Sequence, residues 1–497
     1  MNAGRDDENG GTVMGGSVLQ ATDGDLFIDG RAVSGGRRVE VRDPGRTADV
    51  VATVAEGGPE HVRLAVEAAD RARRGWAATP LDRRLAVLLA AVTAVEQRVD
   101  RLAVLLSREN GGTRIESTMD LSRGAALFRD FLRRAPGVLD ERVVDNDQHR
   151  LTVARRPVGV AGLIVPWNSP VVLTISKLAP ALIAGNTVVV KPSLLAPVVI
   201  GQVLRSIGEL LPDGVVNVVH GGAAVGGALV AHPRVRKVSF TGSVAVGQQI
   251  MAAAAGNVAR ISLELGGNDP AVVLDDVDLD AAAPLLARGI YTRAGQVCFA
   301  VKRVYVPRSR HDQVVEAIRA VVDGFRVGHG LDGETTFGPL ITAAARERVE
   351  GLVRRAGAAG GTVHQLGRPT AAVDWDGGNF MLPRLVTGLG QDAELVAVEQ
   401  FGPVVPVIAY DDVDQAVAMA NDSEFGLCSS VWSADTGRAF EVAGRLEAGG
   451  TFINSHNVSS LSFDMPFGGV KHSGLGRERT DLGLLEYVEE HAIRLAH

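Results

Sequence analysis

Cysteine is nearly absent from this chain, because 497 residues contain only Cys298 and Cys428. So long a chain with two cysteines is not a disulfide scaffold, and we expect a reducing cytoplasm. Apolar runs are also short: none reaches the roughly 18 residues of a membrane-spanning helix. The charged start, Arg5 to Glu8, lacks the apolar core of a signal peptide. No membrane partner is therefore expected.

Positive charge is not in excess either. The net charge is −7, and arginine doublets such as Arg73-Arg74 and Arg133-Arg134 lie in amphipathic patterns that are typical of solvated helix faces. A nucleic-acid partner is therefore not expected. The rest of the composition, 46% hydrophobic and 22% charged, is that of a globular protein. At roughly 150 residues per domain, the length predicts two to four domains.

The pattern along the chain predicts an α/β fold. Residues 1–22 are rich in Gly, Asn, Asp and Ser and are predicted to be a flexible tail. Three helical stretches are expected within 59–134, one of them running from Leu81 to Ser107 and stopped by Asn110-Gly111-Gly112. From about residue 151, and again from Asp269, short β-branched runs alternate with helical stretches. This alternation predicts parallel sheets that helices cover on both faces.

Two residues could carry nucleophilic and acid–base chemistry. Cys298 follows a predicted helix that ends near Gly295, so its thiolate could be a nucleophile, although a buried small apolar side chain is the commoner role. Cys428 lies in an apolar strand-like run, and we interpret it as a buried structural residue. Glu264 ends a predicted strand just before Gly266-Gly267, where a carboxylate could act as a base or simply flank a turn.

Two further motifs could stabilise a negative charge, either on an oxyanion that forms during a reaction or on the phosphate of a ligand. Asn168 in Pro166-Trp167-Asn168 could donate a hydrogen bond to an oxyanion, or could cap the helix that follows. Gly242-Ser243 lies between a predicted strand and a predicted helix, where helix N–H groups can bind phosphate. An ordinary strand–helix turn has the same appearance.

Seven motifs occur along the chain in a fixed order. They are Asn168, Lys191-Pro192-Ser193, Phe240-Thr241-Gly242-Ser243, Glu264-Leu265-Gly266-Gly267, Gln296-Val297-Cys298, Glu399-Gln400-Phe401-Gly402-Pro403 and Pro466-Phe467-Gly468-Gly469. Any one could arise by chance, but seven in order at these spacings leave little room for chance. From about residue 25 to the C-terminus, the sequence resembles the aldehyde dehydrogenase superfamily.

The resemblance implies oxidation of a small-molecule aldehyde to the carboxylic acid. Cys298 would attack the aldehyde, and Asn168 would hold the oxyanion together with the backbone N–H of the nucleophile. A thiohemiacetal and then a thioester would form on the sulfur, and Glu264 would activate the water that releases the acid. The implied cofactor is NAD, with NADP as the alternative, and no metal ion is implied.

The resemblance also implies the cofactor contacts. Lys191 corresponds to the lysine that binds the adenosine ribose, and Ser243 to the serine that contacts phosphate. Glu399 would hold the nicotinamide ribose, with Phe401 beside it. The other cofactor positions implied by the family are Val165, Pro166, Trp167, Ser193, Gly242 and Leu265.

Three positions depart from the family pattern. Leu194 stands where the family often has a Glu that binds the ribose hydroxyls, which weakens the argument for NAD over NADP. Ser169 and Ser176 replace frequent aromatic residues, so we expect a wider or more polar tunnel for a bulky or oxygenated aldehyde. His456 belongs to the loop at the tunnel mouth, and we interpret it as a surface-loop histidine.

The resemblance implies three structural parts. A Rossmann-like cofactor domain would comprise 23–137 and 155–266, and an α/β catalytic domain would comprise 267–466. A small β element for bridging and oligomerisation would comprise 138–154 and 480–497. In the family this element pairs across subunits, so a homodimer or homotetramer is expected.

Two alternatives remain. In the branch of CoA-acylating semialdehyde dehydrogenases, the Glu of Glu-Leu-Gly-Gly is usually replaced, often by Asn, so Glu264 favours water as the acyl acceptor. A non-catalytic cofactor-binding member should have lost Cys298, Glu264 or Asn168, and all three are present.

Overall fold

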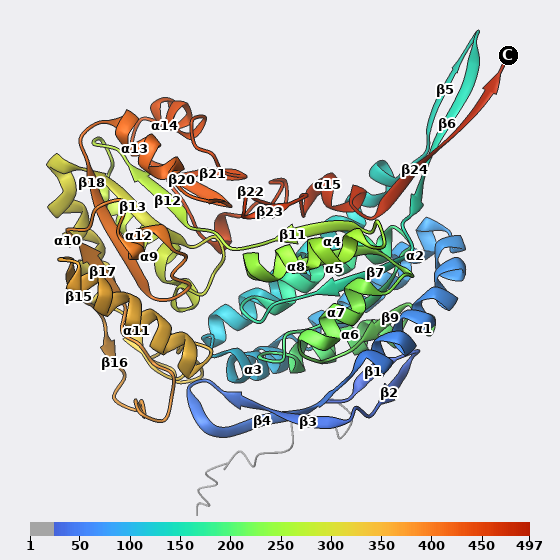
Figure 1. Ribbon diagram of the computed structural model, residues 1–497, viewed down its shortest axis with the longest axis horizontal. Helices are drawn as coiled ribbons and strands as arrows, with labels where there is room; N and C mark the ends of the chain where they lie inside the picture. The colour runs from blue at the N-terminus through green and yellow to red at the C-terminus, as the bar shows by residue number, and fades with distance from the viewer. Residues whose placement is uncertain (1–23) are drawn as a thin grey trace, which may run out of the picture.

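A computed structural model describes residues 24–497 of the protein, and the predicted flexible tail 1–22 lies outside the described residues. Two large sheets occupy opposite ends of the long axis, and a narrow three-stranded ribbon projects from one end (Figure 1). The predicted mixed α/β fold with parallel sheets is confirmed. No helix between residues 24 and 497 combines the length and apolar character needed to cross a membrane.

The first sheet has eight strands in the order β2-β1-β9-β8-β7-β10-β11-β23. Its five central strands, which are β9, β8, β7, β10 and β11 in spatial order, run parallel. Val188, Val189 and Val190 of β8 are fully buried, as expected for a parallel sheet with helices on both faces. The strands are β1 Leu26–Ile28, β2 Arg31–Val33, β7 Val160–Ile164, β8 Thr187–Lys191, β9 Val216–Val218, β10 Val235–Thr241, β11 Arg260–Glu264 and β23 Gly474–Leu475; the helices between them are α5 Pro170–Ile183, α6 Val198–Gly208, α7 Ala223–Ala231 and α8 Val244–Ala255.

Four helices precede this alternation, where three were predicted. They are α1 Pro59–Ala78, α2 Leu81–Glu96, α3 Val99–Asn110 and α4 Arg114–Leu139. The single helix predicted from Leu81 to Ser107 was wrong, because the chain turns at Gln97-Arg98. The Arg98 side chain there contacts Ser206 and Gln202 of α6. No Gly or Pro marks this break, so only the packing against α6 reveals it. The predicted stop is present, with Gly111 in the left-handed region at φ 79°.

The second sheet has seven strands in the order β15-β17-β18-β13-β12-β20-β21, and only β15 runs antiparallel to its neighbour. The chain passes from the first sheet to the second through the short link between β11 and β12, residues 265–268. The strands are β12 Asp269–Val273, β13 Val301–Pro307, β15 Thr362–Gln365, β17 Arg384–Thr387, β18 Val404–Tyr410, β20 Cys428–Trp432 and β21 Gly450–Ile453; the helices are α9 Leu279–Tyr291, α10 His311–Val322, α11 Ala343–Ala358, α12 Glu394–Ala397, α13 Val413–Asn421 and α14 Thr436–Ala443.

The projecting ribbon consists of β5 Arg142–Asn146, β6 His149–Pro157 and β24 Val488–Ala496, with β6 in the middle (Figure 1). Helix α4 continues to Leu139, so the strands begin later than the predicted 138. After the second sheet the chain returns through β23 to the edge of the first sheet, beside β11. The remaining elements are β3 Arg37–Asp43, β4 Arg46–Glu56, β14 Arg326–Val327, β16 Arg368–Pro369, β19 Phe425–Gly426, β22 Val470–Lys471, α15 Thr480–Leu485 and the 3-10 turns Thr292–Gly295, Arg308–Arg310 and Val458–Ser460.

Candidate active site

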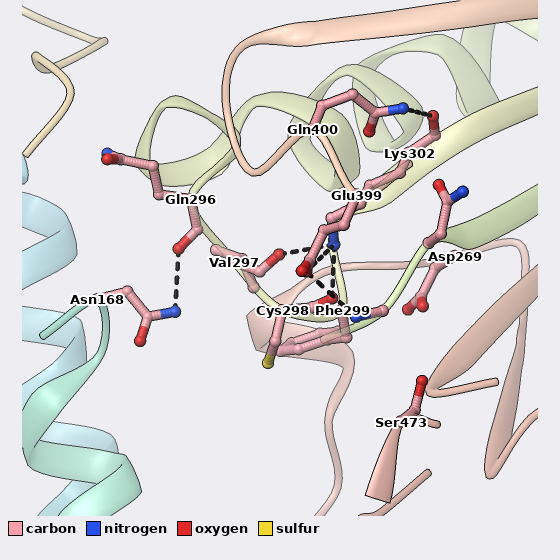
Figure 2. A network of polar contacts seen from close by, with 12 residues as sticks. Asn168, Asp269, Gln296, Val297, Cys298, Phe299, Lys302, Glu399, Gln400 and Ser473 are labelled. Atoms are coloured by element: carbon pink, nitrogen blue, oxygen red, sulfur yellow. Dashed lines mark hydrogen bonds and ion pairs between the residues drawn. The ribbon is translucent and has the colours of Figure 1, made fainter. Parts of the chain in front are cut away.

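Cys298 lies on a tightly held loop after α9. The 3-10 turn Thr292–Gly295 contains Arg293 and Ala294 at positive φ, 53° and 55°, so the backbone here is strained. Lys302 fixes the next segment, because its Nζ donates to the carbonyls of Val297 at 3.0 Å and Cys298 at 2.5 Å. Figure 2 shows the Lys302 amine among these carbonyls and the Cys298 sulfur projecting away from it. Cys298 is partly exposed as a residue.

Asn168 joins the link after β7 to the cysteine loop. Its Nδ2 donates to the carbonyl of Gln296 at 3.0 Å, and its side chain is buried (Figure 2). The alternative that Asn168 caps α5 is wrong. The N-cap residue is Ser169, and Asp120 of α4 accepts hydrogen bonds from the first N–H groups of the helix. The Asn168 amide is therefore held beside the nucleophile rather than used by the helix.

Glu264 ends β11 in a buried position. Its Oε2 has no hydrogen-bond partner among residues 24–497. Burial, and next the charge of Glu478, raise the pKa of this carboxyl well above its usual value. Gly468 lies against it: a Cβ there would lie 2.9 Å from Oε1, and φ is 153°, so both space and backbone favour glycine. This environment therefore favours the protonated form of the Glu264 carboxyl to a higher pH than is usual for a glutamate.

A buried ion pair stands behind Glu264. Lys177, the one charged residue of the otherwise apolar α5, contacts the Glu478 carboxylate and is fully buried. Ser176 Oγ donates to the same carboxylate at 2.6 Å, so this hydroxyl is committed to Glu478. Sequence reasoning missed the roles of Lys177 and Glu478. A lone charge inside an apolar helix was the available signal.

The thiol is neutral in this environment. Burial raises the pKa of Cys298 to about 12. Lys302 opposes the rise, while the carboxyl groups of Glu264, Asp269 and Glu399 add to it. Because the thiolate is the nucleophilic form, attack requires that a base take the thiol proton.

A separate cavity of about 290 Å³ opens near the carboxyl ends of β7, β8 and β10, between α7 and α8. This is the edge where open parallel sheets bind ligands. Lys191 lines the cavity, and burial lowers the pKa of its amine to about 8, so an anion beside it would be favoured. Gly226 and Gly227 line the α7 side of the cavity, where they have no side chains to fill it.

Of the predicted cofactor positions, Lys191 lines this cavity, and the others make contacts of their own. Trp167 and Phe401 pack edge to face with ring centroids 5.8 Å apart. Glu399 accepts the N–H of Gly267 at 3.1 Å and lies 3.6 Å from Lys302 Nζ. The other positions are Val165, whose N–H donates to the Lys191 carbonyl; Pro166, next to it; Ser193, whose hydroxyl accepts the N–H of Leu195; Gly242, before α8; Ser243, whose hydroxyl caps α8; and Leu265, packed against Gly247.

Comparisons with known proteins agree with this geometry. A profile described as "Aldehyde dehydrogenase family" matches residues 31–493. The chain belongs to the aldehyde dehydrogenase family. The predicted membership is therefore confirmed.

Three relatives illustrate the similarity. The chain is 35% identical to the glutarate-semialdehyde dehydrogenase of Pseudomonas aeruginosa, over 95% of this chain and 98% of that one. It is 35% identical to a probable succinate-semialdehyde dehydrogenase [NADP(+)] of Sinorhizobium fredii, over 92% and 93%. The crystal structure of betaine aldehyde dehydrogenase from Staphylococcus aureus, in complex with NAD+, superposes with a TM-score of 0.91 at 33% identity, over 96% and 95%.

His456 of this aldehyde dehydrogenase is not the predicted surface histidine. It is fully buried, its Nε2 lies 2.8 Å from the Phe299 carbonyl, and its Nδ1 lies 2.9 Å from Ser430 Oγ. Its ring also lies 3.5 Å from the buried Asp269 carboxylate. The prediction failed because the loop 454–465 folds inward over β20, which local sequence does not reveal. Cys428, by contrast, is a buried residue of β20 as interpreted.

Proposed function

We propose that this aldehyde dehydrogenase oxidises an aldehyde to the carboxylic acid with NAD or NADP, and that Cys298, Glu264 and Asn168 are its catalytic residues. The observation that carries the proposal is the convergence of three groups. A reachable thiol, an amide held beside it and a buried carboxyl come from separate elements. These are the nucleophile, the oxyanion donor and the base of an acyl-transfer reaction.

The proposed steps use these groups in order. A base takes the thiol proton of Cys298, the sulfur bonds to the carbonyl carbon, and the Asn168 amide donates to the oxygen that becomes negative. A bound nicotinamide would supply the hydride acceptor, and loss of the hydride from this carbon would leave a thioester on the Cys298 sulfur. Water then attacks the thioester, its proton passes to the Glu264 carboxylate, and the C–S bond breaks to release the acid. The ion pair of Lys177 and Glu478 would provide one positive and one negative charge that both act on that carboxylate.

The residues around the cavity fit a dinucleotide. The desolvated Lys191 amine favours an anionic or hydroxyl-rich ligand, and the glycines of α7 allow close approach. Glu399, fixed by Gly267 and Lys302, would hold a ribose near Cys298. Leu194 offers no carboxylate to ribose hydroxyls. We propose NAD, which the similar betaine aldehyde dehydrogenase structure contains, with NADP as the alternative that the assay decides.

The test measures reduced nicotinamide formed by the purified protein. Aliphatic, aromatic and hydroxylated aldehydes are supplied with NAD and NADP in parallel, each with and without CoA. Oxidation without CoA is expected, because Glu264, as the proposed base, would activate water. Activity that requires CoA would move the chain to the acylating branch, and no activity on any aldehyde would favour a non-catalytic role.

Replacing Asn168 with alanine is expected to lower kcat by roughly 10²–10³-fold, the usual loss for one oxyanion donor. The control is the rate at which iodoacetamide alkylates Cys298, because Asn168 also holds the Gln296 carbonyl. An unchanged alkylation rate with lowered kcat assigns the loss to the oxyanion. A kcat within about threefold of the wild type would contradict the role.

We further propose that the protein is a homodimer or homotetramer assembled through the ribbon β5-β6-β24. The ribbon projects from the body (Figure 1). Its apolar residues Val143, Val144, Ile493 and Leu495 are exposed. Isolated ribbons of this kind are marginal in water, so pairing with a second copy would stabilise it. Light scattering should give a mass of two or four chains, and deletion of residues 488–497 should reduce it. A monomeric wild type would contradict this proposal.

We also propose a reducing compartment such as the cytoplasm. Both cysteines are free, and the proposed chemistry needs Cys298 as a thiol. An oxidising compartment would favour conversion of this thiol to a disulfide.

A further inference from the structure

Arg479 has a buried guanidinium group that no other side chain neutralises by direct contact within residues 24–497. The residue is 6% exposed, and its Nη1 makes no hydrogen bond in that range. Among the same described residues its side chain forms no ion pair. Burial is the main influence on this group and lowers its pKa to about 10. A buried charge normally has a counter-charge, because desolvation without one is costly.

The backbone at Arg479 is also strained. Its φ is 64° and its ψ is 179°, a region that is essentially reserved for glycine, and Thr480 follows at φ 51°. Strain of this kind persists where the surrounding structure enforces it, and it concentrates at ligand sites. Glycine would adopt this conformation without strain, so an arginine at this position has an unfavourable backbone conformation.

Arg479 lies close to the proposed reaction centre. Its Cζ is 5.5 Å from the centroid of the Phe467 ring, and that ring is 5.7 Å from the ring of Phe299, the residue after Cys298. Gly468, the neighbour of Phe467, touches the Glu264 carboxyl. Two aromatic rings in contact, Phe467 and Phe299, therefore connect the guanidinium to the residue that follows the nucleophile.

A second cation adds to the positive charge. Arg123 of α4 lies over the Phe463 ring at 5.5 Å, and its Nη2 donates to the Leu461 carbonyl at 2.6 Å. It too forms no ion pair within the described part of the chain, and its charge acts on Arg479. The nearby carboxyl groups do not neutralise the two cations. Burial raises the pKa of Glu264 well above its usual value, and Glu478 is engaged by Lys177 and Ser176.

We propose that Arg479, with Arg123, binds a carboxylate at the far end of the aldehyde substrate, so that the substrates are aldehydes with a terminal carboxylate. A guanidinium fork matches the two oxygens of a carboxylate, and such charged hydrogen bonds are among the strongest that proteins make. This proposal rests on the proposed aldehyde oxidation and specifies its substrate class.

The first test compares 5-oxopentanoate with its methyl ester. The wild-type kcat/KM should be roughly 10–100-fold higher for the acid than for the ester, as expected for hydrogen bonds to a charged group. Arg479→Gly should bring this ratio close to one, mainly through a higher KM for the acid. Arg479→Lys, which keeps the charge, should restore part of the ratio.

Arg123 has a matched control on the same helix. Arg133 is exposed and paired with Asp130. Arg123→Met should lower the ratio of acid to ester, whereas Arg133→Met should leave it unchanged. Equal effects of the two variants would remove Arg123 from the subsite.

A binding experiment separates this subsite from the proposed function. Pentanedioate has the carboxylate but no aldehyde, and calorimetry should show that it binds to the wild type but at least about tenfold more weakly to Arg479→Gly. The same variant should raise Tm by about 1–3 °C, because it removes strain and a desolvated charge. A guanidinium with a merely structural role would instead lower Tm when removed.

A wild-type ratio near one, or equal pentanedioate binding by the wild type and Arg479→Gly, would overturn the subsite. If no aldehyde is oxidised while pentanedioate binding depends on Arg479, the proposed function fails and the subsite stands. If simple aldehydes are oxidised without any preference for the acid, the proposed function stands and the subsite fails.

Discussion

Replacing Cys298 with alanine is expected to lower the rate of reduced-nicotinamide formation by more than about 10⁴-fold, since the covalent route disappears with the sulfur. The loop that carries Cys298 is held by hydrogen bonds that the Lys302 and Asn168 side chains donate to its backbone carbonyls, and these bonds do not involve the thiol. The variant should therefore fold and bind cofactor like the wild type. Absorbance at the wavelength of reduced nicotinamide measures the loss, and calorimetric titration with NAD or NADP checks the binding.

Cys428 provides the matched control for this variant. It is the only other cysteine, it is 2% exposed in β20, and burial raises the pKa of its thiol well above the usual value. Cys428→Ala should keep most of the activity, because an inert buried thiol contributes only packing. Substantial turnover by Cys298→Ala, or a loss in Cys428→Ala as large as in Cys298→Ala, would contradict the assignment of the nucleophile.

Replacing Glu264 with glutamine is expected to lower steady-state turnover by roughly 10²–10³-fold, within the usual range for a general base. The acylation step should survive, because the sulfur and the Asn168 amide remain. The first turnover should therefore give a burst of reduced nicotinamide close to one per active site. Intact-protein mass spectrometry should then detect the thioester on Cys298. Turnover equal to that of the wild type, or no burst, would show that Glu264 does not activate the water.

The pH dependence of the wild type follows from the same group. Burial and the Glu478 charge raise the pKa of Glu264, so its neutral form dominates at low pH and its basic form appears as the pH rises through that pKa. Deacylation should therefore become faster with rising pH, and Glu264→Gln should lack this rise. The raised pKa of the Cys298 thiol acts in the same direction on acylation. Single-turnover measurements across pH separate the two steps.

Local sequence determined the strand and helix alternation, because that pattern follows from the period of buried side chains along each element. The alternation predicted from about residue 151 is present as β7 to β11 with the helices α5 to α8 between them. The motif order also determined the family, since each motif is a short run of residues. The roles of Cys298, Glu264 and Asn168 stay predictions until the variants are measured.

Only the tertiary structure decided which charges are buried together. Lys177 meets Glu478 across 301 residues of chain, the break at Gln97-Arg98 depends on α6, and His456 is buried by a loop that sequence reasoning placed on the surface. Nothing in the local sequence distinguishes Arg479 from other arginines. Only the tertiary structure shows that it is buried, near Phe467 and Arg123. The physical reason is that desolvation and pairing depend on neighbours that are distant along the chain, whereas the periodicity of a helix or strand is local.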